Sequence, residues 1–237
     1  AGRTSAIPSR PARAAHAPTC PSCHQRREFP YDVASAASPD PIEDFVALVE
    51  RFAPLADFLT LDISCPNQAN GRMFLEPAAL ARLLERLVAL PARRAAATPL
   101  LAKLSPDLDP GLLGKLVEVA LGCGIDGFVA ANTTLARPPE LKSRQRLEAG
   151  GLSGRPLFAR ATEVLREVYR LTAGGVPIIG AGGVASGADA YEKIRAGASL
   201  VELYTALIFA GPARLAAIKR ELAALLVRDG FTHVAEA

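Results

Sequence analysis

The stretch "PIIGAGGVASGADAYEKIRAGASLVELY", residues 177–204, carries the pattern of a strand, a helix and a second strand. Residues 177–181 and 199–204 are short apolar runs, which predict buried strands, and residues 188–196 predict a short helix between them. Two consecutive strands joined through a helix lie parallel, with a right-handed crossover. This stretch therefore predicts a βαβ unit of a parallel sheet.

The same alternation extends back to residue 40 and on to residue 228. Helices are predicted to begin at Asp40-Pro41 and Asp109-Pro110, where an acidic N-cap residue precedes a proline. The other predicted elements are strands at 58–63, 99–104 and 126–131, and helices near 76–90, 156–171 and 212–228. Strict alternation predicts an α/β fold, which both doubly wound sheets and (β/α)8 barrels satisfy. Polar or glycine residues follow each strand, and this favours the barrel, whose active sites lie at that face.

Composition excludes several function classes for this chain of 237 residues. A net charge of +3 argues against binding nucleic acid through bulk charge. No apolar run approaches the roughly 18 residues of a membrane span. Of four cysteines only Cys20 and Cys23 are close in sequence, which favours a reducing compartment over a disulfide framework. These two belong to "CPSCH", residues 20–24, a haem-attachment pattern without a helical setting or a second ligand pair, so we expect no metal or haem there.

The chain divides into two unlike parts. Residues 1–30 hold five Arg, five Pro and a single acid, with no apolar periodicity. We therefore expect residues 1–38 to form an irregular, disordered or non-homologous segment. Residues 39–237 are expected to form a domain that binds the ligands, with five βα units. Since a barrel needs eight, we expect this chain to be a fragment, or one whose start was replaced.

Two short segments follow the last two predicted strands, the glycine-rich "GAGGVASG" (180–187) and "LYTAL" (203–207). In barrels this position usually holds a phosphate, cradled by backbone N–H groups. Tight-turn chemistry alone would also explain the glycines. Lys103 ends an apolar strand, where an anionic ligand would pair it, although its chain could instead reach the rim. Residues 132–134, Asn-Thr-Thr, fit either a planar polar ligand or a local turn.

A long basic loop is predicted at residues 135–155. Loops of this length inside compact domains are usually lids or binding loops. Its positive charges would attract an anionic substrate, whereas a solvated loop would need no ligand; they are Arg137, Lys142, Arg144, Arg146 and Arg155.

Two cysteines require separate interpretations. Cys123 lies in a predicted helix-to-strand turn at the opposite face and fits a small packing residue. Cys65 follows the strand at 58–63, on the predicted active face. It is either a buried packing residue or the base of an active site, and a thiolate is a competent base if neighbouring charges or dipoles lower its pKa.

Several motifs together resemble the dihydroorotate dehydrogenase family: "DISCPN" (62–67), Lys103, "NTT" (132–134), "EAGGLSGRPL" (148–157) and residues 177–231. The resemblance spans about residues 39–237 and is strongest to the quinone-linked class. It implies an FMN-dependent (β/α)8 enzyme that oxidises dihydroorotate to orotate in pyrimidine biosynthesis, with a quinone as electron acceptor. It also implies a cytoplasmic location, peripheral on the inner face of the membrane.

The resemblance assigns roles to individual residues. The FMN phosphate would lie on Gly182, Gly183, Tyr204 and Thr205, and Gly154 would lie against the flavin. Further FMN contacts would come from Lys103, Ala131 and Asp62. The pyrimidine would be held by Asp62, Asn67, Asn132 and Thr133. Cys65 would be the catalytic base, which favours that interpretation over packing.

Three departures from the family pattern leave alternatives open. The quinone-linked class usually has Ser where this chain has Cys65, and the family has Asn where it has Asp62. An ionised Asp62 would repel an anionic substrate unless it stays protonated or pairs with Lys103. The missing strands would expose two sheet edges, which favours self-association. The alternatives are therefore an oxidoreductase acting on another dihydropyrimidine, and an inactive partial barrel.

Overall fold

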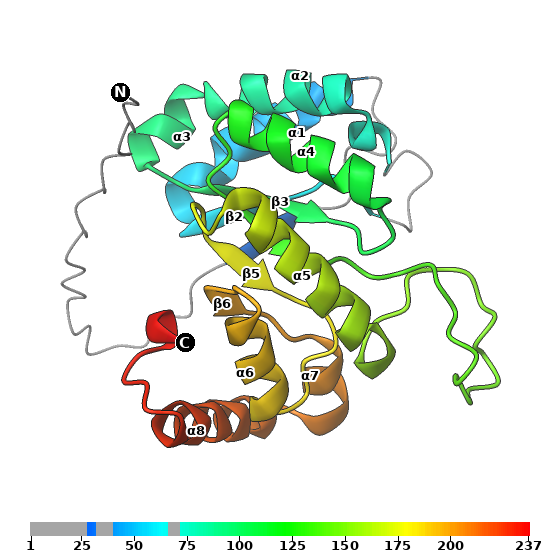
Figure 1. Cartoon of the computed structure of the whole chain (residues 1–237). Coiled ribbons are helices and arrows are strands. Elements are labelled where there is room, and N and C mark those ends of the chain that lie inside the picture. Colours follow the sequence, from blue (N-terminus) through cyan, green and yellow to red (C-terminus); the bar gives the residue numbers. More distant parts are fainter. Residues whose placement is uncertain (1–27, 32–39, 66–71) are drawn as a thin grey trace, which may run out of the picture.

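A parallel sheet forms the centre of the fold in the computed structural model, which describes residues 28–31, 40–65 and 72–237 (Figure 1). In this described part the sheet has six strands in the order β1-β2-β3-β4-β5-β6, and each neighbouring pair is parallel. The strands are β1 (Glu28–Tyr31), β2 (Phe58–Asp62), β3 (Leu100–Leu104), β4 (Gly127–Ala130), β5 (Ile178–Gly180) and β6 (Leu200–Val201). The spatial order follows the chain order, as expected for an arc of βα units.

Helices connect the strands, and the longer ones pack on one another in sequence order. They are α1 (Pro41–Phe52), α2 (Pro77–Val88), α3 (Pro91–Ala96), α4 (Pro110–Gly122), α5 (Phe158–Thr172), α6 (Gly187–Arg195), α7 (Thr205–Ala210) and α8 (Ala213–Arg228). Figure 1 shows α1, α2 and α4 over one end of the sheet and α6, α7 and α8 at the other, with α5 between them. The predicted alternation is confirmed, but α3 and α7 were not predicted.

Local signals set the helix starts as expected. The Asp40 carboxylate accepts hydrogen bonds from the backbone N–H groups of Ile42 (3.1 Å) and Glu43 (3.3 Å). Asp109 does the same at the start of α4, where the N–H of Gly111 is 2.9 Å away. Such side chains satisfy N–H groups that have no partner within the helix.

The two faces of the sheet bury different sets of side chains. Alternate strand residues pack under the helices in the main core, which includes Leu61, Leu100 and Phe128. The other face carries a small buried layer that contains Leu101, Val129, Ile179 and Ala181. Burial on both faces explains why the strands are continuously apolar instead of alternating.

Strand register places two polar side chains above that small layer. Asp62 pairs with Lys103 across β2 and β3, and Lys103 pairs with Val129 across β3 and β4. Because paired residues share a face, Asp62 and Lys103 lie on the same side as Val129. The polar groups therefore stand at the C-terminal end of the inner face.

Two sequence expectations need correction. We counted five strands, but β1 adds a sixth, parallel to β2 from Glu28↔Phe58 to Tyr31↔Leu61. The expectation of an irregular segment at 1–38 is thus wrong for these four residues. β1 is only four residues long, contains Pro30 and lacks apolar periodicity, so its own sequence does not predict a strand. It is a strand because it pairs with β2. The motif at residues 20–24 lies outside the described part of the chain.

In the described part of the chain, no helix has both the length and the apolar character that a membrane crossing requires. Within the same residues β1 and β6 are the outermost strands. Apolar side chains stand exposed near β6: Leu200 is 47% exposed, Ile208 is 65% exposed and Phe209 is 86% exposed.

Candidate active site

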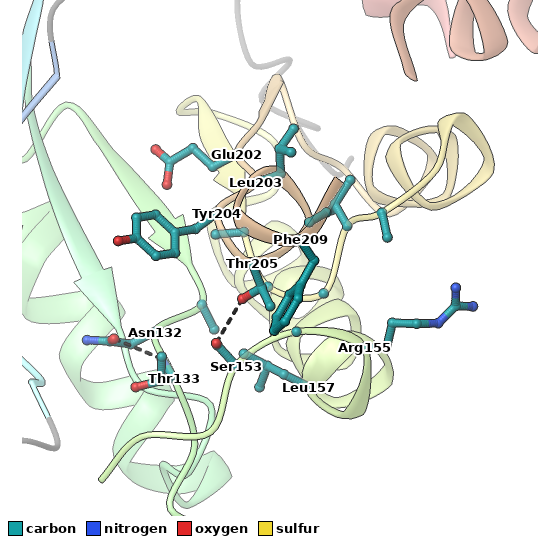
Figure 2. Close-up of a pocket in the computed structure, with 18 of the residues that line it drawn as sticks. Asn132, Thr133, Ser153, Arg155, Leu157, Glu202, Leu203, Tyr204, Thr205 and Phe209 are labelled. Carbon is teal, nitrogen blue, oxygen red and sulfur yellow. Dashed lines mark hydrogen bonds between the residues drawn. The ribbon is translucent and has the colours of Figure 1, made fainter. Parts of the chain in front are cut away.

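A cavity of about 650 Å³ opens at the C-terminal ends of β3, β4, β5 and β6 (Figure 2). Pockets of this size hold ligands as large as cofactors. Nine residues predicted to bind cofactor or substrate line it, namely Lys103, Ala131, Asn132, Thr133, Gly154, Gly182, Gly183, Tyr204 and Thr205. The strand ends therefore bring together residues that lie as far as a hundred positions apart in the sequence, as a barrel face does.

The turn after β5 accepts only glycine at two successive positions. Gly182 has φ of +92° and Gly183 has φ of +78°, in the region that side chains disfavour. A Cβ atom at Gly182 would lie 2.8 Å from Cβ of Ala161, and one at Gly183 would lie 2.6 Å from Cβ of Phe158. We call Gly182 and Gly183 the cradle. Their bare backbone lines the cavity and fits a close approach of an anionic group such as a phosphate.

The loop that follows β4 is tied to the start of α7. The hydroxyl groups of Ser153 and Thr205 are 2.8 Å apart, within hydrogen-bonding distance (Figure 2). Gly154 has φ of +80°, and a Cβ atom there would lie 3.0 Å from Cγ2 of Thr205. Ser153 belongs to a motif we recognised, yet only its contact with Thr205 identifies it as part of the site.

A hydrogen-bond network joins the ends of β2, β3 and β4. The Asn132 amide donates to the Asp62 carboxylate (2.8 Å) and to the Ser64 hydroxyl (3.4 Å). The Ser64 hydroxyl donates to the Lys103 carbonyl (2.9 Å). The backbone N–H of Ser64 donates to the Asp62 carboxylate (3.3 Å). These donors suit an ionised Asp62, which can only accept. The network therefore gives Asp62 a partner that the sequence analysis did not consider, Asn132.

The remaining predicted residues lie differently. Cys65 follows β2 and is buried, 5% exposed, but it is not among the residues that line the cavity. Asn67 lies outside the described residues. Cys123 is half-buried at the end of α4, where burial, and then the nearby Glu85 carboxylate, raise its pKa. A protonated thiol there agrees with the predicted packing role.

The loop at 135–155 is folded back on itself. Thr134 and Leu152 form an isolated antiparallel bridge, and the Arg137 guanidinium donates to the carbonyl groups of Glu148 (2.9 Å) and Gly150 (2.5 Å). Arg137, one of the basic residues of this loop, therefore holds the loop base together. Arg155 lines the cavity, but its side chain extends away from the other labelled residues in Figure 2.

The sequence analysis assigned no role to several cavity residues, of which Glu202 and Phe209 carry the most distinctive side chains. Glu202 and Phe209 both line the cavity, from the end of β6 and from α7. The predicted strand at 199–204 included Glu202, whereas β6 ends at Val201, so that the glutamate directly follows the strand. Phe209 became visible only with α7, a helix of six residues that the pattern does not predict.

Comparison with known proteins places the chain in one protein family. A family model described as dihydroorotate dehydrogenase matches residues 21–226, and so begins earlier than the resemblance we drew from residue 39. A dihydroorotate dehydrogenase (quinone) of Xanthobacter autotrophicus is 48% identical over 207 residues, which are 84% of this chain and 57% of that protein. One of Azorhizobium caulinodans is 48% identical over 204 residues, with the same shares.

Solved structures agree with these sequence matches. A ligand-free dihydroorotate dehydrogenase from Eimeria tenella superposes with a TM-score of 0.78 at 36% identity, and the match covers 84% of this chain and 59% of that one. The same enzyme in complex with ferulenol gives a TM-score of 0.77 at 32% identity, covering 84% and 58%. The chain thus spans little more than half the length of the curated relatives it matches, and its sheet is part of a (β/α) barrel.

Proposed function

Because this chain belongs to the dihydroorotate dehydrogenase family, we propose that it binds FMN and dihydroorotate in the cavity at its strand ends and takes part in oxidising dihydroorotate to orotate. The observation that carries the proposal is the cradle, where bare backbone lines the cavity and a Cβ atom at either position would clash. Such a turn suits a phosphate ester, and the rest of the cavity has room for a planar ring system.

The residues of the cavity divide between the two ligands. Gly182, Gly183, Tyr204 and Thr205 would hold the FMN phosphate, and Gly154 would lie against the flavin ring. Lys103 would place its positive charge at the electron-rich part of that ring, with Ala131 and Asp62 completing the cofactor contacts. When bound, FMN supplies the two-electron acceptor for the hydride.

The pyrimidine would be oriented by the polar groups after β2 and β4, namely Asp62, Asn67, Asn132 and Thr133. Cys65 is proposed as the base, whose thiolate takes a proton from the ring carbon next to the one that gives up hydride. Cys65 is buried three residues after the end of β2, close in sequence to Asp62 of the polar network.

The acceptor of the electrons is proposed to be a quinone, because the relatives are named dihydroorotate dehydrogenase (quinone). A quinone dissolves in the membrane, so the proposed site of action is the inner face of the cytoplasmic membrane. We also infer that this chain self-associates near β6, since Ile208 and Phe209 are 65% and 86% exposed there.

One observation favours a second candidate, a related oxidoreductase on a neutral dihydropyrimidine. Asp62 brings a carboxylate to the polar network, and an ionised carboxylate repels the anionic dihydroorotate. Dihydrouracil carries no such charge. Comparing the two compounds as reductants of the flavin separates the candidates.

The visible spectrum of the purified chain after incubation with FMN tests the proposal. Bound flavin bands that bleach when dihydroorotate is added without oxygen are the expected result. Flavin that bleaches only with dihydrouracil would favour the second candidate. Failure to retain FMN would contradict the proposal for this chain and would favour an inactive partial barrel.

A further inference from the structure

Lys193 is a buried cation that the proposed chemistry does not use. It lies on α6 with a relative exposure of 0%, and its Nζ makes no hydrogen bond within the described part of the chain. Lysine is almost never fully buried unless it is paired, because removing its charge from water is costly. A position this unfavourable calls for a compensating role.

The side chain runs from α6 across β5 toward the start of α5. A Cβ atom on Gly180 would lie 3.2 Å from Cβ of Lys193 and 3.3 Å from Cδ2 of Leu165, so a bare glycine makes room for the lysine stem. At the other end, Nζ lies 5.1 Å from the centroid of the Phe158 ring, a cation–π distance. The ammonium group is thus held over the first residue of α5.

Phe158 is also the residue against which Gly183 of the cradle packs, whereas Gly182 packs against Ala161 and Leu157. A Cβ atom on Gly183 would lie 2.7 Å from Cα and 2.8 Å from the backbone nitrogen of Phe158. Phe158 therefore contacts both the Lys193 ammonium group, through its ring, and Gly183 of the cradle, through its backbone. In this buried surrounding a charge acts over a longer range than it would in water.

We propose that Lys193 is a positioning residue for the cradle: its positive charge, placed behind Phe158, favours a ligand that carries a phosphate over the same ligand without one. The inference rests on the proposed function, since it takes the ligand to be FMN. Its own content is a selectivity for FMN over riboflavin, which has the same ring system and no phosphate.

The charges around Lys193 make this selectivity depend on pH. Burial is the largest influence and lowers the pKa of Lys193 to about 8. From its own helix Glu192 and Asp189 raise the pKa, and from α5 Arg166 lowers it. Above pH 8 the ammonium group loses its proton, so the preference for FMN declines there. The FMN phosphate has lost its second proton already near pH 6 and contributes no change.

The test is a fluorescence titration of FMN and of riboflavin into the flavin-free chain at pH 7 and pH 9, with four proteins. They are the parent chain, Lys193→Met, Lys193→Arg and the exposed control Lys115→Met on α4. The selectivity ratio is the dissociation constant of riboflavin divided by that of FMN. For the parent chain and the control, this ratio is expected to fall about tenfold between pH 7 and pH 9. Lys193→Met should show the low ratio at both pH values, and Lys193→Arg the high ratio at both, since arginine keeps its charge.

The outcomes separate this inference from the proposed function. FMN binding by the parent chain with a ratio that does not change with pH would overturn the inference alone. The same holds if Lys193→Met, folded by circular dichroism, keeps the parent's ratio at pH 7. No binding of FMN by the parent chain would overturn the proposed function and the inference with it. If Lys193→Met does not fold, the pH dependence of the parent chain decides by itself.

Discussion

At the scale of single residues, Asp62 and Asn132 define how this site differs from its family pattern. The Asn132 amide lies 2.8 Å from Asp62 and is committed to a neighbouring carboxylate. An amide that donates within the protein has fewer hydrogens left for a ligand. Asp62 therefore has two effects on the site. It adds a negative charge, and it accepts a hydrogen bond from Asn132 that a ligand could otherwise accept.

Replacing this charge should strengthen binding of an anionic pyrimidine. In Asp62→Asn we expect the affinity for orotate to rise by roughly tenfold. The reason is that the repulsion between the Asp62 carboxylate and the orotate carboxylate, about 1 to 2 kcal/mol, is removed. Binding of neutral dihydrouracil should stay constant. Isothermal titration measures both. Asp57→Asn, exposed at the opposite end of β2, is the matched control and should change neither affinity. Equal orotate affinities for Asp62→Asn and the parent would mean that this carboxylate does not face the ligand.

Lys193 should destabilise the fold in a manner that depends on pH. The pKa of Lys193 is about 8 in the folded state and 10.5 as the reference value. Below pH 8 the lysine is therefore protonated in both the folded and the unfolded state. The folded state then carries the full cost of burying the ammonium group, about 3 kcal/mol. From pH 8 to 10.5 the unfolded state binds more protons, and the free energy of unfolding rises with pH. Lys193→Met should thus be more stable than the parent at pH 7, by an amount that shrinks toward pH 10. Urea denaturation at both pH values measures this, and a constant difference would speak against a lowered pKa.

At the scale of elements, the site depends on how β5, α5 and α6 fit together. Glycines at 180, 182 and 183 remove three side chains where the strand end meets these helices. The close fit brings backbone to the cavity wall and buries Lys193 between strand and helix. Turn formation explains why glycine is common in a segment like this one. Each of these three glycines is required, however, because side chains of other elements lie where its Cβ atom would be.

Adding one methyl group to the cradle should disrupt it. In Gly183→Ala the new Cβ meets Phe158 at 2.6 Å with φ at +78°, and we expect a loss of about 2 to 4 kcal/mol together with loss of FMN binding. Gly230→Ala is the control, because Gly230 has φ of +85° with no atom within 4 Å of the added Cβ. That control should lose only about 1 kcal/mol and keep its ligand affinity. Thermal unfolding and FMN titration give the two readouts, and equal losses in the two variants would refute the close packing of the cradle.

At the scale of the whole molecule, the described part of the sheet is an arc whose outermost strands are β1 and β6. Parallel sheets are normally covered on both faces and closed or shielded at their edges. Near β6 the arc instead presents Leu200, Ile208 and Phe209 to solvent. Ile208 and Phe209 are consecutive residues of α7, so two large apolar side chains are exposed next to each other in the chain.

We expect this exposed surface to make the 237-residue chain associate with itself. The double variant Ile208→Ser, Phe209→Ser should shift the population toward the monomer, because two large apolar side chains leave the contact. Size-exclusion chromatography with light scattering over a range of concentrations measures the change. Leu147→Ser, at an equally exposed leucine of the loop, serves as control and should leave the association unchanged. A parent chain that stays monomeric at high concentration would contradict the expectation.

The sequence by itself determined the alternation of elements, because apolar periodicity and caps such as Asp40 act within a few residues. It also identified nine of the residues that line the cavity, since residues just past parallel strands meet at one face. Only the tertiary structure decided that β1 pairs with β2, that Asn132 donates to Asp62, and that Lys193 lies over Phe158. The physical reason is common to all three: each depends on contacts between residues 30 or more positions apart, which no local pattern encodes.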